Sequence, residues 1–379
     1  MASEKQLSGY AQLWGAIIRP PRQQYELADL GPASFTLQGR DYHRSDLTLL
    51  NTRGQTLHCS HFEPDDSARV ADMLPCVIYL HGNCSSRLES LEVLEVLLPL
   101  HISVFAFDFA GSGLSDGEYI SLGWFEREDL AMVVEHLRFT GRTNHIGLWG
   151  RSMGAVTALL YAPLDPELAG VVLDSAFSSL PELAQELAAS HASVPSFLIS
   201  AGLSLVRSSI KKKIGLDIQD LKPIHFAPQS LIPALFICAE QDTLVLPYHT
   251  RRLYSAYAGR KKLISIPGEH NGLRPQSVID QVQKFFCQVL RCHSLPSSRS
   301  TAPCGFAFHT LPRNSAGVGS CGGFVQMAKE ADVNELLAAM LEEIKEYREK
   351  PESVDLLGLE DSPKKPAKQP QKAPNLLDL

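Results

Sequence analysis

The chain alternates between short, continuous apolar runs and longer segments in which apolar positions recur at helical spacing. Continuous apolar runs bounded by turn residues are typical of strands buried on both faces of a parallel sheet. Such runs occupy residues 75–80, 102–107, 146–149, 169–173, 231–238 and 262–266, and helical spacing is found at 88–100, 124–137, 155–161, 250–258 and 275–290. This alternation predicts an α/β fold with a mostly parallel central sheet flanked by helices.

The N-terminal part of the chain has weaker periodicity. Residues 46–62 alternate around a central Arg-Gly pair, which predicts an antiparallel hairpin ahead of the parallel strands. Residues 17–22 contain two prolines, and we expect this stretch to run extended over the surface because proline lacks an N–H donor and disfavours helix. We therefore predict an N-terminal extended segment at 1–39 and a main domain at 40–293.

After residue 293 the composition changes abruptly. Residues 294–323 are rich in Ser, Gly and Pro, which predicts a flexible linker. Residues 324–349 regain helical spacing, with apolar residues on one face and Glu and Lys on the other, so we predict an amphipathic helix. Its apolar stripe needs a partner, either the main domain or another protein chain. Residues 350–379 are rich in Pro and Lys and are predicted to form a disordered tail.

Two leucine clusters with acidic neighbours lie in this tail, at 355–360 and 375–379. They resemble adaptor-binding motifs of the clathrin-box type, which would make the tail a docking site for a protein partner. Patterns this short also arise by chance, so both interpretations stay open.

Composition narrows the class of protein. The net charge of -7 gives no electrostatic reason to expect a nucleic acid partner. The 8 cysteines are scattered without a C-x-x-C pair or Cys/His metal spacing, so we expect reduced thiols in an intracellular protein and no metal site. No apolar run approaches the length that spans a bilayer, and the first residues lack a secretory leader. The expected location is cytoplasmic.

The segment Gly150-Arg-Ser152-Met-Gly154 lies between an apolar strand and an Ala- and Leu-rich helical stretch. G-x-S-x-G in a strand-turn-helix context predicts a nucleophile elbow, in which the flanking glycines leave space and the serine hydroxyl projects above the sheet. The helix that follows directs its backbone N–H groups and positive dipole end towards an oxyanion beside the serine. Ser152 is therefore the predicted nucleophile, and the alternative is an incidental serine in a glycine-flanked loop.

A serine nucleophile needs a base, and the base needs an orienting acid. The strand at 231–238 leads into Asp242, and the strand at 262–266 leads into His270. The carboxyl ends of parallel strands meet at one sheet edge, where ligands bind. We therefore predict His270 as the general base and Asp242 as the acid. His270 is chosen by its position, because the chain contains 13 histidines.

Two other acidic residues are alternatives for the acid, and two backbone amides are candidates for the oxyanion hole. Asp174 also ends a predicted strand and is the alternative acid, whereas Glu240 is less suitable because it lies nearer to its strand. An acyl-transfer site also needs donors for the tetrahedral oxyanion. The amides of Met153, directly after the nucleophile, and Asn83, in the loop after the strand at 75–80, are the predicted oxyanion hole.

Five stretches occur in a fixed order along the chain: His81-Gly82-Asn83, the glycine-rich turn at 108–115, the elbow at 150–154, Asp242, and Gly268-Glu269-His270. With these motifs, residues 40–292 resemble the α/β-hydrolase superfamily and are most similar to its serine-aminopeptidase-like branch. The resemblance implies an α/β-hydrolase fold and a serine hydrolase that uses neither a metal nor an organic cofactor. It implies no substrate, because one fold hosts many chemistries.

Members of this superfamily often carry a cap over the active site, and residues 175–230 are the corresponding insertion here. Helical segments are predicted at 180–189 and 197–210, and the second ends in a basic cluster. The segment Phe197–Lys213 has two interpretations. It is either a cap helix whose basic end complements the helix dipole, or an interfacial helix that makes peripheral membrane contact or attracts an acyl substrate.

The leading hypothesis is a hydrolase that cleaves an ester, thioester or amide through an acyl-Ser152 intermediate. Esters and thioesters are favoured over peptides because no acidic cluster for a free α-amine is identified in the sequence. One alternative is a serine aminopeptidase-type peptidase with a peptidyl substrate. An alternative from another class is a catalytically idle hydrolase fold that acts as an adaptor through its C-terminal tail.

Overall fold

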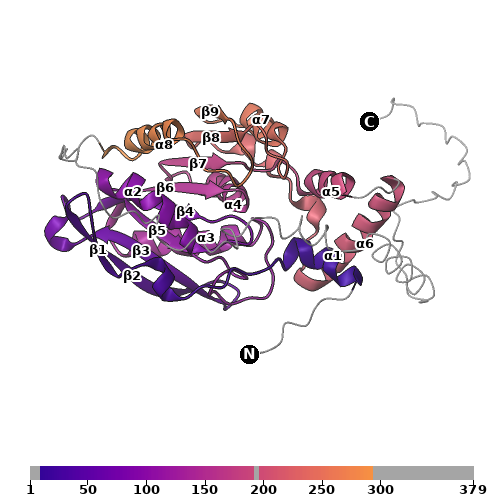
Figure 1. Ribbon diagram of the computed structural model, residues 1–379, viewed down its shortest axis with the longest axis horizontal. Helices are drawn as coiled ribbons and strands as arrows, with labels where there is room; N and C mark the ends of the chain where they lie inside the picture. Colours follow the sequence, from indigo (N-terminus) through magenta and orange to yellow (C-terminus); the bar gives the residue numbers. More distant parts are fainter. Residues whose placement is uncertain (1–8, 192–195, 293–379) are drawn as a thin grey trace, which may run out of the picture.

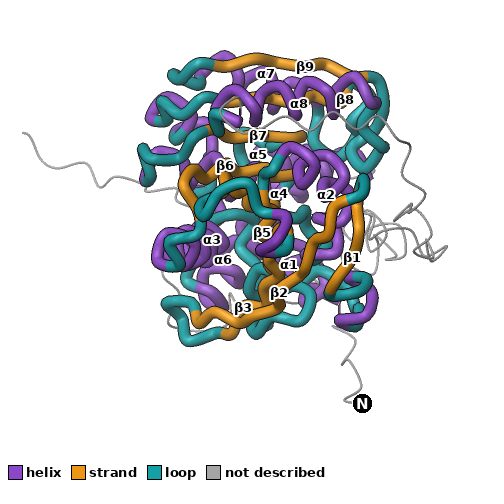
Figure 2. The backbone as a smooth tube through the Cα atoms, turned by 90° about the vertical axis from the view of Figure 1, so that its left-hand side faces the viewer, coloured by secondary structure: helices purple, strands orange, loops and turns teal. Residues whose placement is uncertain are grey.

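The computed structural model describes residues 9–191 and 196–292. The predicted linker at 294–323, helix at 324–349 and tail at 350–379, with its leucine clusters, lie outside the described residues. The described chain forms one nine-stranded sheet with helices on both faces (Figures 1 and 2). The strands are β1 Ser34–Leu37, β2 Arg40–Leu50, β3 Thr56–Pro64, β4 Leu74–Leu80, β5 Ser103–Phe107, β6 Thr143–Arg151, β7 Gly170–Asp174, β8 Ala234–Ala239 and β9 Lys261–Ile266. The α-helices are α1 Gly9–Ile18, α2 Leu91–Leu97, α3 Glu126–Phe139, α4 Met153–Tyr161, α5 Leu180–His191, α6 Ser196–Ile214, α7 Pro247–Ala256 and α8 Gln276–Val289.

The strand order is β1-β2-β3-β5-β4-β6-β7-β8-β9. Strands β4 to β9 pair in parallel, whereas β1, β2 and β3 form an antiparallel edge that includes the predicted hairpin. Figure 2 shows the strands stacked from β9 at the top to β2 and β3 at the bottom. The six predicted parallel strands and the α/β fold class are confirmed. Strand β8 begins later than predicted, at Ala234, because Pro233 has no N–H to donate to a sheet ladder.

The hydrophobic core lies in two layers, one on each face of the sheet. Every residue of β4 is buried, and alternate side chains enter different layers. Ile78 belongs to the layer covered by α3, α4 and α7, whereas Val77 belongs to the layer covered by α2 and α8. This two-sided burial explains why the central strands are continuous apolar runs in the sequence.

The N-terminal segment differs from the prediction. Residues 9–18 form helix α1, so the prediction of an extended segment over all of 1–39 is wrong. Trp14, Ile17 and Ile18 are spaced i, i+3 and i+4, which places them on one helix face, and that face is buried in the core. The helix ends before Pro20, and the chain then runs without regular structure to residue 26.

Helices α5 and α6 are inserted between β7 and β8, as predicted for the cap at 175–230. Figure 1 shows α1, α5 and α6 at one end of the molecule, away from α2 and α8, and α6 contacts both α1 and α5. The basic end of α6 is paired within the protein: the Arg207 guanidinium donates to both Asp217 oxygens at 2.6 and 2.7 Å, and Lys211 donates at 3.3 Å. The Lys213 ammonium lies 3.9 Å from the centre of the Trp14 ring. Membrane contact through Phe197–Lys213 stays a prediction.

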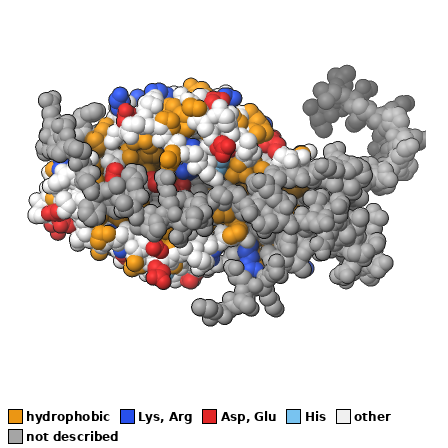
Figure 3. All heavy atoms as spheres, in the orientation of Figure 1, with side chains coloured by type: hydrophobic (Ala, Val, Ile, Leu, Met, Phe, Trp, Pro, Cys, Tyr) orange, Lys and Arg blue, Asp and Glu red, His pale blue; other side chains and the backbone are white. Residues whose placement is uncertain are grey.

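The described surface carries mixed charges. Figure 3 shows acidic and basic side chains interspersed over the visible described part of one face, without a continuous basic field there. The absence of a nucleic acid partner, expected from the net charge of -7, stays a prediction.

Candidate active site

The predicted elbow joins the end of β6 to the start of α4. Ser152 adopts φ +53° and ψ -114°, a backbone conformation that L-residues with a side chain rarely take. Two backbone hydrogen bonds hold it there: the Ser152 amide donates to the Asp174 carbonyl at 2.8 Å, and the Val156 amide donates to the Ser152 carbonyl at 3.0 Å. Strained positions of this kind cluster at functional sites because the surrounding structure must over-determine them.

The two elbow glycines are required by close backbone packing. A Cβ on Gly150 would lie closer than 3.0 Å to the backbone of Gly154, and a Cβ on Gly154 would lie closer than 3.0 Å to the backbone of Leu80 and His81. Backbone atoms of this kind cannot move aside as a flexible side chain would. The glycines therefore let α4 begin directly against the end of β4, as the G-x-S-x-G pattern predicts.

The three residues predicted as nucleophile, base and acid lie in hydrogen-bond contact. His270 Nε2 is 3.0 Å from Ser152 Oγ, and His270 Nδ1 is 2.6 Å from Asp242 Oδ2. The other Asp242 oxygen, Oδ1, accepts from the amides of Leu244 at 2.9 Å and Val245 at 2.8 Å. An ionised carboxylate only accepts, so the imidazole proton lies on Nδ1 and Nε2 is free to accept from the serine hydroxyl.

Both alternative acids have other partners. The Arg274 guanidinium binds Asp174 with two hydrogen bonds, at 2.7 Å from Nε and 2.8 Å from Nη2. Burial raises the pKa of Asp174, but the charge and hydrogen bonds of Arg274, together with the charge of Arg151, outweigh this effect, so the pKa lies below the ordinary aspartate value. Glu240 pairs with Arg251 at the surface. Among the three acids, Asp242 is the one that contacts the imidazole.

Sequence reasoning missed two arginines that hold the histidine loop. Arg274 donates to the carbonyl oxygens of Gly272 at 2.9 Å and His270 at 3.1 Å, and Arg151 also donates to the His270 carbonyl at 3.1 Å. Arg151 occupies the variable position between Gly150 and Ser152, and Arg274 follows His270 by four residues. Neither position has a residue pattern that would have marked it as part of the site.

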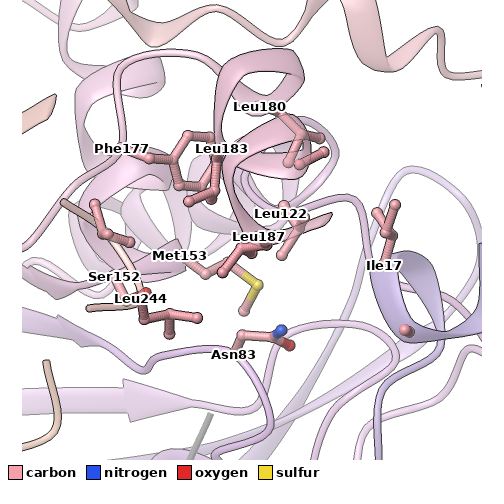
Figure 4. A pocket seen from close by; sticks show the side chains of 13 residues that line it. Ile17, Asn83, Leu122, Ser152, Met153, Phe177, Leu180, Leu183, Leu187 and Leu244 are labelled. Carbon is pink, nitrogen blue, oxygen red and sulfur yellow. The ribbon is translucent and has the colours of Figure 1, made fainter. Parts of the chain in front are cut away.

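The predicted oxyanion donors lie on either side of the serine. Met153 is the first residue of α4, so its N–H has no partner within that helix. Asn83 lies in the loop after β4, and Glu89 fixes this loop by accepting from the Gly82 amide at 2.8 Å. Figure 4 shows Asn83, Met153 and Ser152 around the same pocket. Their role as oxyanion donors stays a prediction.

A pocket with a cavity volume of about 60 Å³ opens beside Ser152 (Figure 4). Asn83 and Ser152 are its polar lining residues, and none of the residues that line it carries a charge. The apolar lining comes from α1, α4, the cap helix α5 and three loops: Ala16, Ile17, Leu122, Met153, Phe177, Leu180, Leu183, Ala184, Leu187, Leu244 and Val245.

The described residues contain neither a metal-binding cluster nor a membrane-spanning helix. No cluster of three or more His, Cys, Asp or Glu side chains in residues 9–191 and 196–292 could hold a metal ion. Within the same residues, no helix is both long and apolar enough to cross a membrane. The cytoplasmic location stays a prediction.

Comparisons with known proteins show the family and the fold of the chain. The profile of the family described as "Serine aminopeptidase, S33" matches residues 72–210, and that of "PhoPQ-activated pathogenicity-related protein" matches 207–304. The uncharacterised protein YqkD of Bacillus subtilis is 32% identical over 217 residues, which are 55% of this chain and 67% of YqkD. Human monoglyceride lipase is 30% identical over 183 residues, 46% of this chain and 59% of that protein. The structure of the Pyrococcus furiosus esterase Pf2001 superimposes with a TM-score of 0.54 at 23% identity, over 72% of this chain and 99% of that chain.

The sheet order, the elbow and the cap insertion define an α/β-hydrolase. More narrowly, the chain belongs to the serine-aminopeptidase-like branch of the α/β-hydrolase superfamily, and it is a hydrolase. The fold and the family expected from the sequence are both confirmed.

Proposed function

We propose that this protein is a serine hydrolase that cleaves a carboxylic ester or thioester through an acyl-Ser152 intermediate. One observation carries the proposal: a hydrogen-bonded chain runs from Ser152 Oγ to His270 Nε2 at 3.0 Å and from His270 Nδ1 to Asp242 Oδ2 at 2.6 Å. These are heavy-atom distances at which a base can accept the proton of a nucleophile. The uncharged pocket beside Ser152 offers a place for the acyl group.

In the acylation step, Ser152 Oγ attacks the substrate carbonyl carbon while its proton moves to His270 Nε2. The carbonyl electron pair moves to oxygen, and the amides of Met153 and Asn83 donate to the oxyanion. Asp242 holds the Nδ1 proton and stabilises the imidazolium. The tetrahedral intermediate then breaks its bond to the alcohol or thiol, which leaves with the proton from Nε2, and the acyl group stays on Ser152.

In the deacylation step, water replaces the leaving group. His270 Nε2 takes one proton from the water as its oxygen attacks the acyl carbon, and the oxyanion forms again in the same place. The bond to Ser152 Oγ then breaks, and Oγ takes the proton back from Nε2. The carboxylic acid leaves, and the enzyme returns to its starting state without any external cofactor.

The pocket favours esters and thioesters over peptides with a free N-terminus. A buried α-ammonium group needs a carboxylate or comparable acceptors, because burying an unpaired charge is costly. None of the residues that line this pocket is Asp or Glu. The names of two similar proteins, a monoglyceride lipase and an esterase, support the same choice.

The alternative of a catalytically idle adaptor does not explain the strained backbone at Ser152 or the hydrogen bond between His270 and the Ser152 hydroxyl. An adaptor would gain nothing from a nucleophile held at φ +53°. The tail on which that alternative depends lies outside the described residues.

The test is hydrolysis of p-nitrophenyl esters by the full chain and three variants. Ser152→Ala is expected to lower kcat by about 10⁴-fold or more, and Asp242→Asn by about 10⁴-fold because the histidine then loses its correct tautomer. Asp174→Asn is the matched control at the alternative acid. It should cost at most about tenfold, because Arg274 still binds the carbonyls of the histidine loop.

Three results would contradict the proposal. If Ser152→Ala keeps wild-type hydrolysis, the nucleophile lies elsewhere. If Asp174→Asn loses more activity than Asp242→Asn, the acid assignment is wrong. A folded wild-type protein that hydrolyses neither esters nor thioesters would instead support the adaptor.

A further inference from the structure

The pocket beside Ser152 extends to helix α1, which forms its opposite end. Figure 4 shows Ser152 at one side of the pocket and Ile17 at the opposite side, with Asn83, Met153 and Leu187 between them. Helix α1 spans Gly9–Ile18, outside the stretch that matches the serine aminopeptidase family. This wall is therefore supplied by a segment that the family match does not cover.

We infer that helix α1 closes an acyl pocket and that Ile17 sets the length of the acyl chain that the enzyme accepts. The inference rests on the proposed function, since the acyl group is defined by its bond to Ser152. It assigns a specificity role to a residue in the stretch at 17–22, which the sequence predicts to run extended over the surface.

The wall is anchored from two directions, so Ile17 has a defined position. On one side, α1 packs against the cap helix α6, where the Lys213 ammonium lies 3.9 Å from the Trp14 ring centre. On the other side, the Ile120 amide donates to the Ile18 carbonyl at 2.8 Å. Just beyond the helix, Arg22 donates to the Ser115 carbonyl at 2.9 Å. These contacts hold the helix that carries Ile17 in place, so this side chain can act as a steric limit.

The chemistry of the lining selects an uncharged hydrocarbon chain. The side chains between Ser152 and Ile17 are apolar except for Asn83, so a charged or strongly polar acyl group would be desolvated without a partner. The preferred acyl group is therefore an unsubstituted aliphatic chain.

The size of the pocket sets the expected length. Its volume is about 60 Å³, on a scale on which one buried water needs about 10–15 Å³. This corresponds to about four to six water-sized groups. We therefore expect acyl chains of about four to six carbons to fit, and longer chains to collide with Ile17.

The experiment measures kcat/KM of the full chain for p-nitrophenyl esters of even-numbered straight-chain acids from acetate to dodecanoate. The wild type should prefer chains of about four to six carbons and lose at least about tenfold by ten carbons, because a misfitting methylene group costs about tenfold or more. Ile17→Ala removes three carbons and should move the optimum about two carbons longer, with the octanoate-to-butyrate ratio rising about tenfold. Ile17→Phe should move the optimum towards acetate.

Ile18→Ala is the matched control. It makes the same truncation in the same helix at a residue that is 1% exposed and is not among those lining the pocket. It should lower stability as much as Ile17→Ala without moving the chain-length optimum. If Ile17→Ala does not fold, Ile17→Val removes a single methyl group and should still lengthen the optimum by about one carbon.

The inference is overturned if the Ile17 variants and Ile18→Ala give the wild-type chain-length profile, or if the two alanine variants change it equally. Failure of this kind is distinct from failure of the proposed function. If hydrolysis depends on Ser152 but the preferred acyl-chain length does not change in the Ile17 variants, only the pocket assignment fails. The proposed function fails when Ser152→Ala remains active.

Discussion

Removing the Arg274 guanidinium should destabilise the protein by stranding a buried charge. The side chains of Arg274 and Asp174 are 7% and 4% exposed, and two hydrogen bonds of 2.7 and 2.8 Å join them. Deleting one partner of a buried ion pair costs about 3–5 kcal/mol, mostly because the other charge is left uncompensated. The positive charge of Arg151 also acts on Asp174, so we expect Arg274→Met to lie at the lower end, about 3 kcal/mol.

A double variant separates charge from packing. In Asp174→Asn/Arg274→Met the stranded carboxylate is replaced by a neutral amide of similar size. We therefore expect the double variant to be about 2 kcal/mol more stable than Arg274→Met, because a neutral polar group costs far less to bury than an ion. Both variants lose the Arg274 hydrogen bonds to the His270 and Gly272 carbonyls, so both should lose about tenfold or more in kcat.

Urea denaturation at pH 7 measures these differences through the midpoint at constant m value. The destabilisation of Arg274→Met should also shrink as the pH falls towards 4, because the unpaired Asp174 then takes up a proton more readily than in the unfolded chain. The reasoning is refuted if Arg274→Met costs less than about 1 kcal/mol, or if the double variant is no more stable than the single one.

Two further predictions concern the elbow and the cap. Gly154→Ala should lower stability by about 3 kcal/mol or more and abolish esterase activity, because its Cβ meets the backbone of Leu80. Gly82→Ala is the control and should fold normally, because its Cβ meets nothing nearer than 3.7 Å. Thermal unfolding with circular dichroism distinguishes them, and equal melting temperatures would contradict the packing account. Hydrogen bonds from Arg207 hold the pKa of Asp217 at about 2, below its unfolded value, so this stabilisation is present above about pH 4 and is lost as the pH falls towards 2. Asp217→Asn should therefore lower the free energy of unfolding by about 1 kcal/mol at pH 7, a value reduced because solvent screens the two cations. The difference from wild type should vanish near pH 2, and a difference independent of pH would refute the assignment.

The parts of the fold that could be predicted are those whose packing leaves a pattern within one short stretch of sequence. Strand β4 is buried on both faces, so its apolar run is continuous, and the elbow needs glycines at 150 and 154 because backbone packs on backbone. Parallel strands bring their carboxyl ends to one edge, which is why Asp242 and His270 could be placed beside Ser152 from their positions alone.

The parts that were not predictable depend on contacts between distant segments. Helix α1 has three strongly apolar positions on its buried face, and prolines follow it closely. Because proline disfavours helix, the sequence predicted an extended segment there. Its helix is stabilised by packing against α6 and the core, which no local pattern reveals. Arg274 and Asp174 are 100 residues apart in the sequence, so no local pattern links them. Ile17 and Leu187 line the pocket, but in the sequence they cannot be told from ordinary apolar core residues.

The most direct test of the account is the covalent labelling of the full chain by a fluorophosphonate, followed by mass spectrometry of its peptides. The account predicts a single adduct on the peptide that contains Ser152, with no adduct in the folded Ser152→Ala variant. An adduct on another residue, or no adduct on a folded wild-type protein, would contradict the claim that Ser152 is the nucleophile.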